Sequence, residues 1–205
     1  MRIGILGGSF NPPHNGHILN ANSLLKSNYI DKVILVPTGE KYNKPELAPA
    51  KDRLKMASIA VKEQKNIYVS DYEQKRNLVY AFETLNYFQK QYPNDEIFFI
   101  CGSDNLEKFD TWREYKYILQ HYKLLVMKRS NLKFPEKLNN YRDRITFVET
   151  KSTLSSSSIR EIIQENAGSE FLRTNLNKNV LKYIKKRKLY GKNKLQIRRG
   201  LFKTL

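Results

Sequence analysis

Short apolar runs alternate along this chain with segments whose apolar residues recur at helical spacing. The runs are rich in Ile, Val, Leu and Phe and too short for helices, which favours strands. They occupy 2–7, 32–37, 67–70, 96–102, 123–128 and 145–149. Helical spacing is found over 18–25, 50–61, 79–88 and 112–119. Strict alternation of strand and helix predicts a doubly wound α/β fold whose sheet is mostly parallel.

Two amphipathic helices are predicted after the sixth strand, over 157–165 and 177–188. Val180, Leu181 and Ile184 form an apolar stripe on the second, which we expect to pack back on the domain. No Pro- or Gly-rich linker divides the chain. We therefore predict one domain over 1–191 and a basic C-terminal extension over 192–205.

The positive charge of the chain is concentrated near its C-terminus. The 205 residues carry a formal net charge of +17, of which +12 lies in 171–205 and only +5 in 1–170. Such an excess suggests a basic nucleic-acid-binding module, a function that needs no enzyme. However, few aromatic residues are interleaved with the basic run, and a solvated helix face explains it equally well. Nucleic acid is therefore not the expected partner.

Cysteine usage and hydropathy restrict the setting in which the protein works. The single Cys101 excludes a disulfide framework and a four-thiolate zinc site. No apolar run approaches the roughly 20 residues that span a bilayer, and the N-terminal apolar run is too short for a signal peptide. We expect a cytoplasmic protein without a membrane partner. The oligomeric state stays open, and a homo-oligomer is compatible with the sequence.

The segment after the first strand, Gly7-Gly8-Ser9-Phe10-Asn11-Pro12-Pro13-His14-Asn15-Gly16-His17, has the residues of a phosphate site. In open α/β sheets ligands bind beyond the carboxyl ends of the strands, and helix N-termini hold anions there. Gly7 and Gly8 let backbone amides approach a ligand. His14 and His17 stand three residues apart, which places them on one helix face. A zinc site and a purely structural helix-capping pair are the alternatives to phosphate chemistry.

A second anion-binding segment, Leu154-Ser155-Ser156-Ser157-Ser158-Ile159-Arg160, follows the sixth predicted strand. Its hydroxyls and free amides open a helix, and Arg160 adds a forked cationic donor. Taken alone, this segment is also explained as an N-cap with a solvated arginine.

Together the two segments resemble the nucleotidyltransferase superfamily, whose members have a Rossmann-like fold and a His-x-Gly-His motif. The resemblance implies attack of a phosphate on the α-phosphorus of ATP, with loss of pyrophosphate and with Mg2+ carried by ATP rather than by protein side chains. It makes His14, His17 and Arg160 the catalytic candidates. It assigns ATP binding to Gly7, Gly8, Ser9, Phe10, His14, Gly16, His17, Gly102, Asp104, Ser155, Ser156, Ser157, Ile159 and Arg160.

Within the superfamily, residues 1–191 resemble the bacterial nicotinate mononucleotide adenylyltransferases. The resemblance implies that ATP and nicotinate mononucleotide are joined to give deamido-NAD. It assigns mononucleotide binding to Thr38, Lys41, Lys44, Tyr80, Thr84 and Trp112, with Trp112 stacked on the pyridine. Arg53 also matches a family motif, but its role stays open.

The chain departs from that family pattern at the residues expected to contact the pyridine. Ala81 replaces a threonine that helps to hold the nicotinate carboxylate, so the choice between nicotinate and nicotinamide mononucleotide stays open. The family's usual Pro-Pro-His-Lys substrate loop is also absent. Phosphopantetheine adenylyltransferase, which shares both phosphate motifs, is the enzymatic alternative.

Overall fold

A computed structural model describes residues 1–41, 46–76, 79–128, 134–165 and 169–191. It contains one sheet of six strands in the order β3-β2-β1-β4-β5-β6, and every neighbouring pair is parallel. The strands are β1 Arg2–Gly8, β2 Lys32–Pro37, β3 Ile67–Val69, β4 Glu96–Gly102, β5 Lys123–Lys128 and β6 Ile145–Glu149. The predicted doubly wound fold is confirmed, with an entirely parallel sheet.

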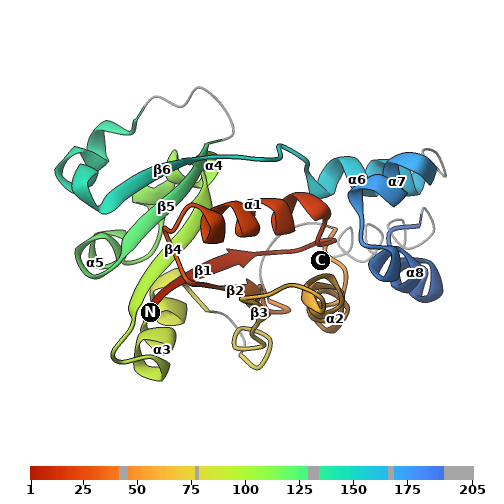
Figure 1. The fold of residues 1–205 in the computed structure, drawn as a ribbon, viewed down its shortest axis with the longest axis horizontal. Coiled ribbons are helices and arrows are strands. Elements are labelled where there is room, and N and C mark those ends of the chain that lie inside the picture. Colours follow the sequence, from red (N-terminus) through yellow and green to blue (C-terminus); the bar gives the residue numbers. More distant parts are fainter. Residues whose placement is uncertain (42–45, 77–78, 129–133, 166–168, 192–205) are drawn as a thin grey trace, which may run out of the picture.

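The sheet is covered by helices on both faces (Figure 1). The helices are α1 Asn15–Lys26, α2 Ala50–Val61, α3 Ala81–Gln91, α4 Ser103–Leu106, α5 Tyr115–His121, α6 Ser156–Gln164, α7 Ser169–Asn175 and α8 Lys178–Arg187, with 3-10 helices η1 Phe109–Thr111 and η2 Glu136–Arg144. The sequence predicted neither the short elements α4, η1 and η2 nor α7.

Alternating side chains of the strands form two cores. Ile3 and Ile5 of β1 pack with Leu85 of α3 and Ile118 of α5 on one face. Leu6 packs on the other face, in a cluster that includes Ala21 and Leu24 of α1. The near-continuous apolar strands follow from burial on both sides, as expected of a parallel sheet.

A third apolar cluster holds the C-terminal helices against α2. Val180 and Ile184 of α8 are fully or almost fully buried there beside Met56 of α2, which confirms the predicted packing of the apolar stripe. On the polar side, the buried carboxylate of Asp52 accepts hydrogen bonds from Tyr183 (2.7 Å) and Arg187 (3.1 Å). Figure 1 shows α6, α7 and α8 gathered on the side toward which β1 runs.

One predicted helix begins later than expected, and this affects the site. Helix α5 starts at Tyr115 rather than at residue 112, because Trp112 has an extended backbone and Glu114 is left-handed. Trp112 therefore stands in a connection between η1 and α5, beyond the carboxyl end of β4.

Candidate active site

The loop after β1 brings two histidines into contact at the start of α1. His14 is the N-cap residue, is almost fully buried, and has its ring centroid 3.7 Å from that of His17. The backbone N–H of His14 donates to Nδ1 of His17 at 3.1 Å. A neutral imidazole carries one proton, so this hydrogen bond places the proton of His17 on Nε2. His17 therefore offers Nε2 as a hydrogen-bond donor.

Two predicted ATP-binding residues of this loop have roles in packing. Phe10 is buried, has a left-handed backbone with φ 45°, and places its ring 5.0 Å from that of His17. A Cβ on Gly16 would come within 2.7 Å of Ser152 Oγ and 2.9 Å of His14 Nδ1. Glycine at position 16 thus lets α1 pack against the segment after β6, a constraint that the sequence did not reveal.

The second motif folds against the first, although about 145 residues separate them. Ser156 Oγ donates to the carbonyl oxygen of Pro12 at 2.9 Å, and Arg160 Nη1 donates to that of Asn11 at 3.0 Å. Ser155 caps α6 by accepting the N–H of Ser158. The structure therefore brings the loop that carries the two histidines (the histidine loop, residues 9–17) into contact with the serine-rich start of α6. The prediction that both motifs contribute to one site requires this contact.

Arg160 has further partners around its guanidinium group. Nη2 donates to Ser157 Oγ at 3.3 Å and lies 3.8 Å from the Glu46 carboxylate. By contrast, Ile159 is fully buried in the cluster that holds α8. Arg160 thus links the start of α6 to the loop after β1, and the buried Ile159 side chain anchors the helix in the apolar cluster.

A cavity of about 410 Å³ opens beside the loop after β1, at the carboxyl ends of β1 and β2. Six predicted site residues line it: Gly7, Gly8, Thr38, Tyr80, Thr84 and Trp112. The Trp112 ring packs at 5.1 Å from Phe109 and 5.7 Å from Phe99, centroid to centroid. One wall of the cavity is therefore a supported aromatic surface, suited to a flat ring.

The lining of the cavity also contains Glu73, which no sequence motif indicated. Its side chain is mostly buried, and Thr84 Oγ1 donates to Glu73 Oε1 at 2.8 Å. Burial raises the pKa of Glu73 to about 7, despite the Thr84 hydrogen bond and nearby Arg53. Its position four residues beyond β3, toward the ligand-binding edge of the sheet, was the available signal.

The open role of Arg53 is resolved as structural. Its side chain is fully buried, and burial lowers its pKa. It donates to the carbonyl oxygens of Ser9, Gly39 and Ala48 and to Thr38 Oγ1, each between 2.9 and 3.0 Å. Arg53 therefore ties the loops after β1 and β2 to one another.

Four further predicted site residues are Gly102, Asp104, Lys41 and Lys44. Gly102 ends β4 and caps α4, where Asp104 is exposed in the first turn. Lys41 is exposed and does not line the cavity, and Lys44 lies outside the described residues.

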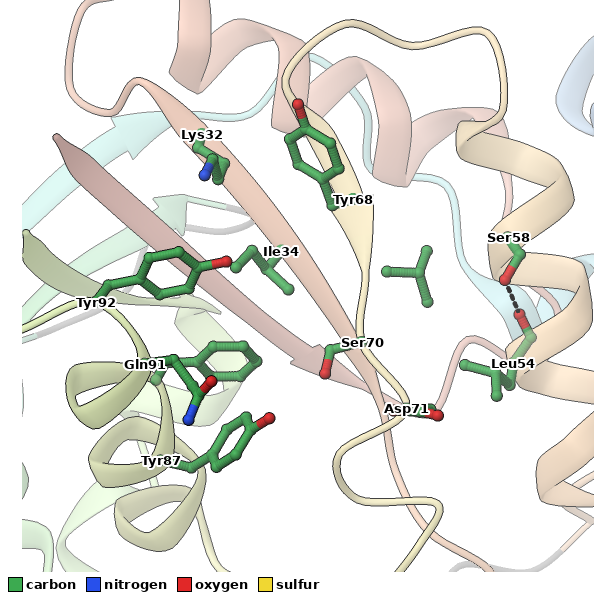
Figure 2. Close-up of a pocket in the computed structure, with 12 residues that line it drawn as sticks. Lys32, Ile34, Leu54, Ser58, Tyr68, Ser70, Asp71, Tyr87, Gln91 and Tyr92 are labelled. Carbon is green, nitrogen blue, oxygen red and sulfur yellow. Dashed lines mark hydrogen bonds between the residues drawn. The ribbon is translucent and has the colours of Figure 1, made fainter.

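A separate groove of about 770 Å³ lies beside the edge strand β3, between α2 and α3 (Figure 2). Lys32 Nζ stands 4.9 Å from the Tyr92 ring centroid and 5.6 Å from that of Tyr68. None of the predicted site residues lines this groove.

No three His, Cys, Asp or Glu side chains within the described ranges are grouped as a metal site. None of the helices in these ranges combines the length and apolar character that a bilayer-spanning helix needs.

Comparisons with known proteins agree with this arrangement. A family model described as cytidylyltransferase-like matches residues 5–162. A probable nicotinate-nucleotide adenylyltransferase of Endomicrobium trichonymphae is 34% identical, over 92% of this chain and 98% of its own. Similarly named proteins of Caldicellulosiruptor bescii (34%, covering 93% and 99%) and Borrelia hermsii (32%, covering 95% and 100%) also match.

Solved structures share the fold at lower sequence identity. The Plasmodium falciparum nicotinic acid mononucleotide adenylyltransferase complexed with NaAD superimposes with a TM-score of 0.77 at 21% identity, covering 92% of this chain and 97% of that one. The same enzyme complexed with APC gives a TM-score of 0.76 at 20% identity, with coverage of 92% and 96%.

A parallel Rossmann-like sheet with paired histidines and a serine-rich helix start at its ligand edge defines a nucleotidyltransferase of the cytidylyltransferase-like class. Within this class, the chain belongs to the nicotinate-nucleotide adenylyltransferase family, enzymes of NAD biosynthesis.

Proposed function

We propose that this chain transfers the adenylyl group of ATP to nicotinate mononucleotide. A phosphate oxygen of the mononucleotide attacks the α-phosphorus of ATP, the bond from that phosphorus to the oxygen bridging to the β-phosphorus breaks, and pyrophosphate leaves. The dinucleotide deamido-NAD is the other product. The observation that carries this proposal is the contact of Ser156 and Arg160 with the histidine loop, which forms one anion site from two distant motifs.

The geometry supports a division of work among the site residues. Nε2 of His17 would donate to an oxygen of the α-phosphate, and buried His14 holds His17 in that tautomer through its backbone. Arg160 and the serines at the start of α6 would bind the β- and γ-phosphates. Because charge accumulates on these oxygens as the bond breaks, donors fixed in advance accelerate the reaction.

Mg2+ fits this scheme as an ion carried mainly by the nucleotide. Phosphate oxygens are ligands that Mg2+ prefers, and the ion would neutralise charge on the leaving pyrophosphate. The described residues provide no side-chain cluster for it, although Asp104 lies exposed at the same edge of the sheet. We also propose that the enzyme acts in the cytoplasm.

The cavity beside the phosphate loop would hold the pyridine. Trp112, supported by Phe99 and Phe109, provides a face for stacking, and Tyr80 and Thr84 lie around the same space. A cavity of about 410 Å³ fits one aromatic ring with its ribose, in the size range of small-molecule sites.

His17→Ala tests the catalytic assignment. The variant loses the Nε2 donor, and we expect pyrophosphate release to fall by at least a hundredfold, because removing one such donor costs about 10²–10³ in rate. His121→Ala removes an exposed histidine at the end of α5 and is the matched control, with a rate within about twofold of the parent.

Steady-state kinetics with competing acceptors tests the substrate assignment. We expect nicotinate mononucleotide to give a higher kcat/KM than phosphopantetheine. A near-normal rate for His17→Ala, or preferred turnover of phosphopantetheine, would contradict the proposal.

A further inference from the structure

The cavity that would hold the pyridine has an unusual polar wall for a site that receives a carboxylate. Glu73 and Thr84 form this wall, and both side chains are more than nine-tenths buried. Thr84 Oγ1 donates its proton to Glu73 Oε1, so the threonine hydroxyl can only accept from a ligand. With Glu73 ionised, this wall therefore presents acceptors and a negative charge.

The charged groups around Glu73 do not cancel the negative charge of this wall. Glu83, in the first turn of α3, accepts the backbone N–H of Tyr80 at 2.8 Å and adds a second negative charge nearby. Arg53 lies behind the wall with four hydrogen bonds to loop oxygens. Arg113 also lines the cavity, but its side chain is exposed to water, which screens its charge, and its guanidinium carbon lies 4.8 Å from the Tyr80 ring centroid. On the segment of Glu73 itself, Arg76 stacks on the Tyr72 ring.

Protonation would reverse the polarity of the wall. A neutral carboxyl group donates one hydrogen bond, either to Thr84 or to a ligand, and the Thr84 hydroxyl can then turn its own proton toward the cavity. The proton on Glu73 thus converts an anionic, accepting wall into a neutral, donating one. The pKa of Glu73, raised to about 7 by burial, allows this change near neutral pH.

We propose that Glu73 is a specificity-determining residue that adjusts the choice between nicotinate and nicotinamide mononucleotide to its own protonation state. The neutral acid favours a ring carboxylate, to which it can donate. The ionised acid opposes that carboxylate and accepts a hydrogen bond from a ring carboxamide. Ala81, which also lines the cavity, adds no hydroxyl that would offset this effect. The inference rests on the proposed function, because it requires the pyridine in this cavity.

The test is the ratio of kcat/KM for the two mononucleotides, measured with the full chain between pH 6 and pH 8. Both acceptors carry the same ribose phosphate, so its titration cancels in the ratio, and kcat/KM reports ionisations of the free enzyme. We expect the preference for nicotinate over nicotinamide mononucleotide to fall about tenfold across this interval, as Glu73 ionises. A ratio that does not change with pH would overturn the inference.

Two variants separate this role from a structural one. Glu73→Gln keeps the shape of the side chain but does not titrate, and we expect its ratio to be independent of pH. Glu83→Gln removes the neighbouring charge without lining the cavity, and we expect the pH dependence to persist with its midpoint at lower pH. A pH dependence that survives in Glu73→Gln would overturn the inference even if Glu83→Gln behaves as expected.

The outcomes for the inference and for the proposed function are distinguishable. If neither mononucleotide is adenylylated, the proposed function fails. If both are adenylylated with a constant ratio, only the role of Glu73 fails. Should Glu73→Gln not fold, the pH dependence of the parent ratio and the midpoint of Glu83→Gln still decide the question.

Discussion

At the scale of single residues, burial and the number of hydrogen-bond partners together determine the protonation and the role of the charged groups in the site. Arg53 lies in the first turn of α2 and Glu73 in the segment after β3, and both lose most contact with water. Arg53 is compensated by four hydrogen-bond acceptors and keeps a structural role. Glu73 has one hydroxyl donor, so its ionised form stays unfavourable and its pKa rises.

This difference predicts how pH affects stability. The folded pKa of Glu73, about 7, exceeds the ordinary value of 4.5, so the folded state binds the proton more tightly than the unfolded state. Its stabilising contribution is therefore complete below about pH 4.5 and is lost as pH rises through 7. Between pH 5 and 8, urea titration should show the parent losing about 3 kcal/mol of unfolding free energy relative to Glu73→Gln.

The control for this experiment is Glu63→Gln, which changes an exposed carboxylate just beyond α2. Its unfolding free energy should follow that of the parent at every pH within about 0.5 kcal/mol. Parallel curves for the parent and Glu73→Gln would show that Glu73 ionises normally in the folded protein.

Which residues lie together at the candidate site was predictable from the sequence only where a motif specifies them. His14, His17, Ser156 and Arg160 belong to local patterns, and the structure brings them together. The role of Arg53 depends on four acceptors from two loops, one after β1 and one after β2, which no local pattern reveals. Glu73 resembles any carboxylate after a strand until α3 buries it.

At the scale of elements, long strands and helices were predictable and short ones were not. All six strands were predicted because each is a continuous apolar run. Helices α4, η1 and η2 were missed, since a short or 3-10 helix shows no 3.6-residue period. The missed boundary at Trp112 mattered most, because the extended backbone there lets the ring line the cavity.

Helix α8 is expected to affect nucleotide binding through the residues that follow it. Tyr190 is buried, and its hydroxyl donates to Asn11 Oδ1 at 3.0 Å. The same oxygen accepts the N–H of Ala48, and Asn11 Nδ2 donates to the carbonyl oxygen of Glu46. Asn11 therefore joins the loop after β1, the segment before α2 and Tyr190, three residues beyond α8.

Tyr190→Phe tests this connection. Loss of one buried hydrogen bond should reduce the unfolding free energy by about 1 kcal/mol. Because Asn11 also positions Arg160 through its carbonyl oxygen, we expect KM for ATP to rise several-fold. Tyr68→Phe, at a half-exposed position on the edge strand, is the control and should change neither quantity. An unchanged KM in Tyr190→Phe would mean that α8 supports the fold alone.

At the scale of the whole molecule, the net charge of +17 divides between two regions with different consequences. Residues 1–170 carry +5 and contain both phosphate motifs, and residues 171–205 carry +12. A mild positive field raises the rate at which anionic nucleotides meet the site. The extension over 192–205 lies outside the described residues, so its predicted separation from the domain stays a prediction.

An RNA-binding measurement tests whether the positive charge of the C-terminal region binds nucleic acid. We expect the full chain to bind single-stranded RNA more weakly than about 1 μM at 0.15 M salt, in the range of non-specific association. A chain ending at Gly191 should retain adenylyl transfer within about twofold. Submicromolar binding with a steep salt dependence, lost on this truncation, would instead support a nucleic-acid function.

The contact between Tyr190 and Asn11 also sets the order in which the site is completed during synthesis. Asn11 leaves the ribosome 179 residues before the tyrosine that holds it, and β1, at the centre of the sheet, gains β4 as its second neighbour only after most of the first half has been made. A nascent chain thus carries this loop long before its last hydrogen-bond partner, Tyr190, is made. In a chain that stops before α8, Asn11 keeps its partners Glu46 and Ala48 but lacks Tyr190, so the last hydrogen bond on the loop after β1 forms only when synthesis is almost finished.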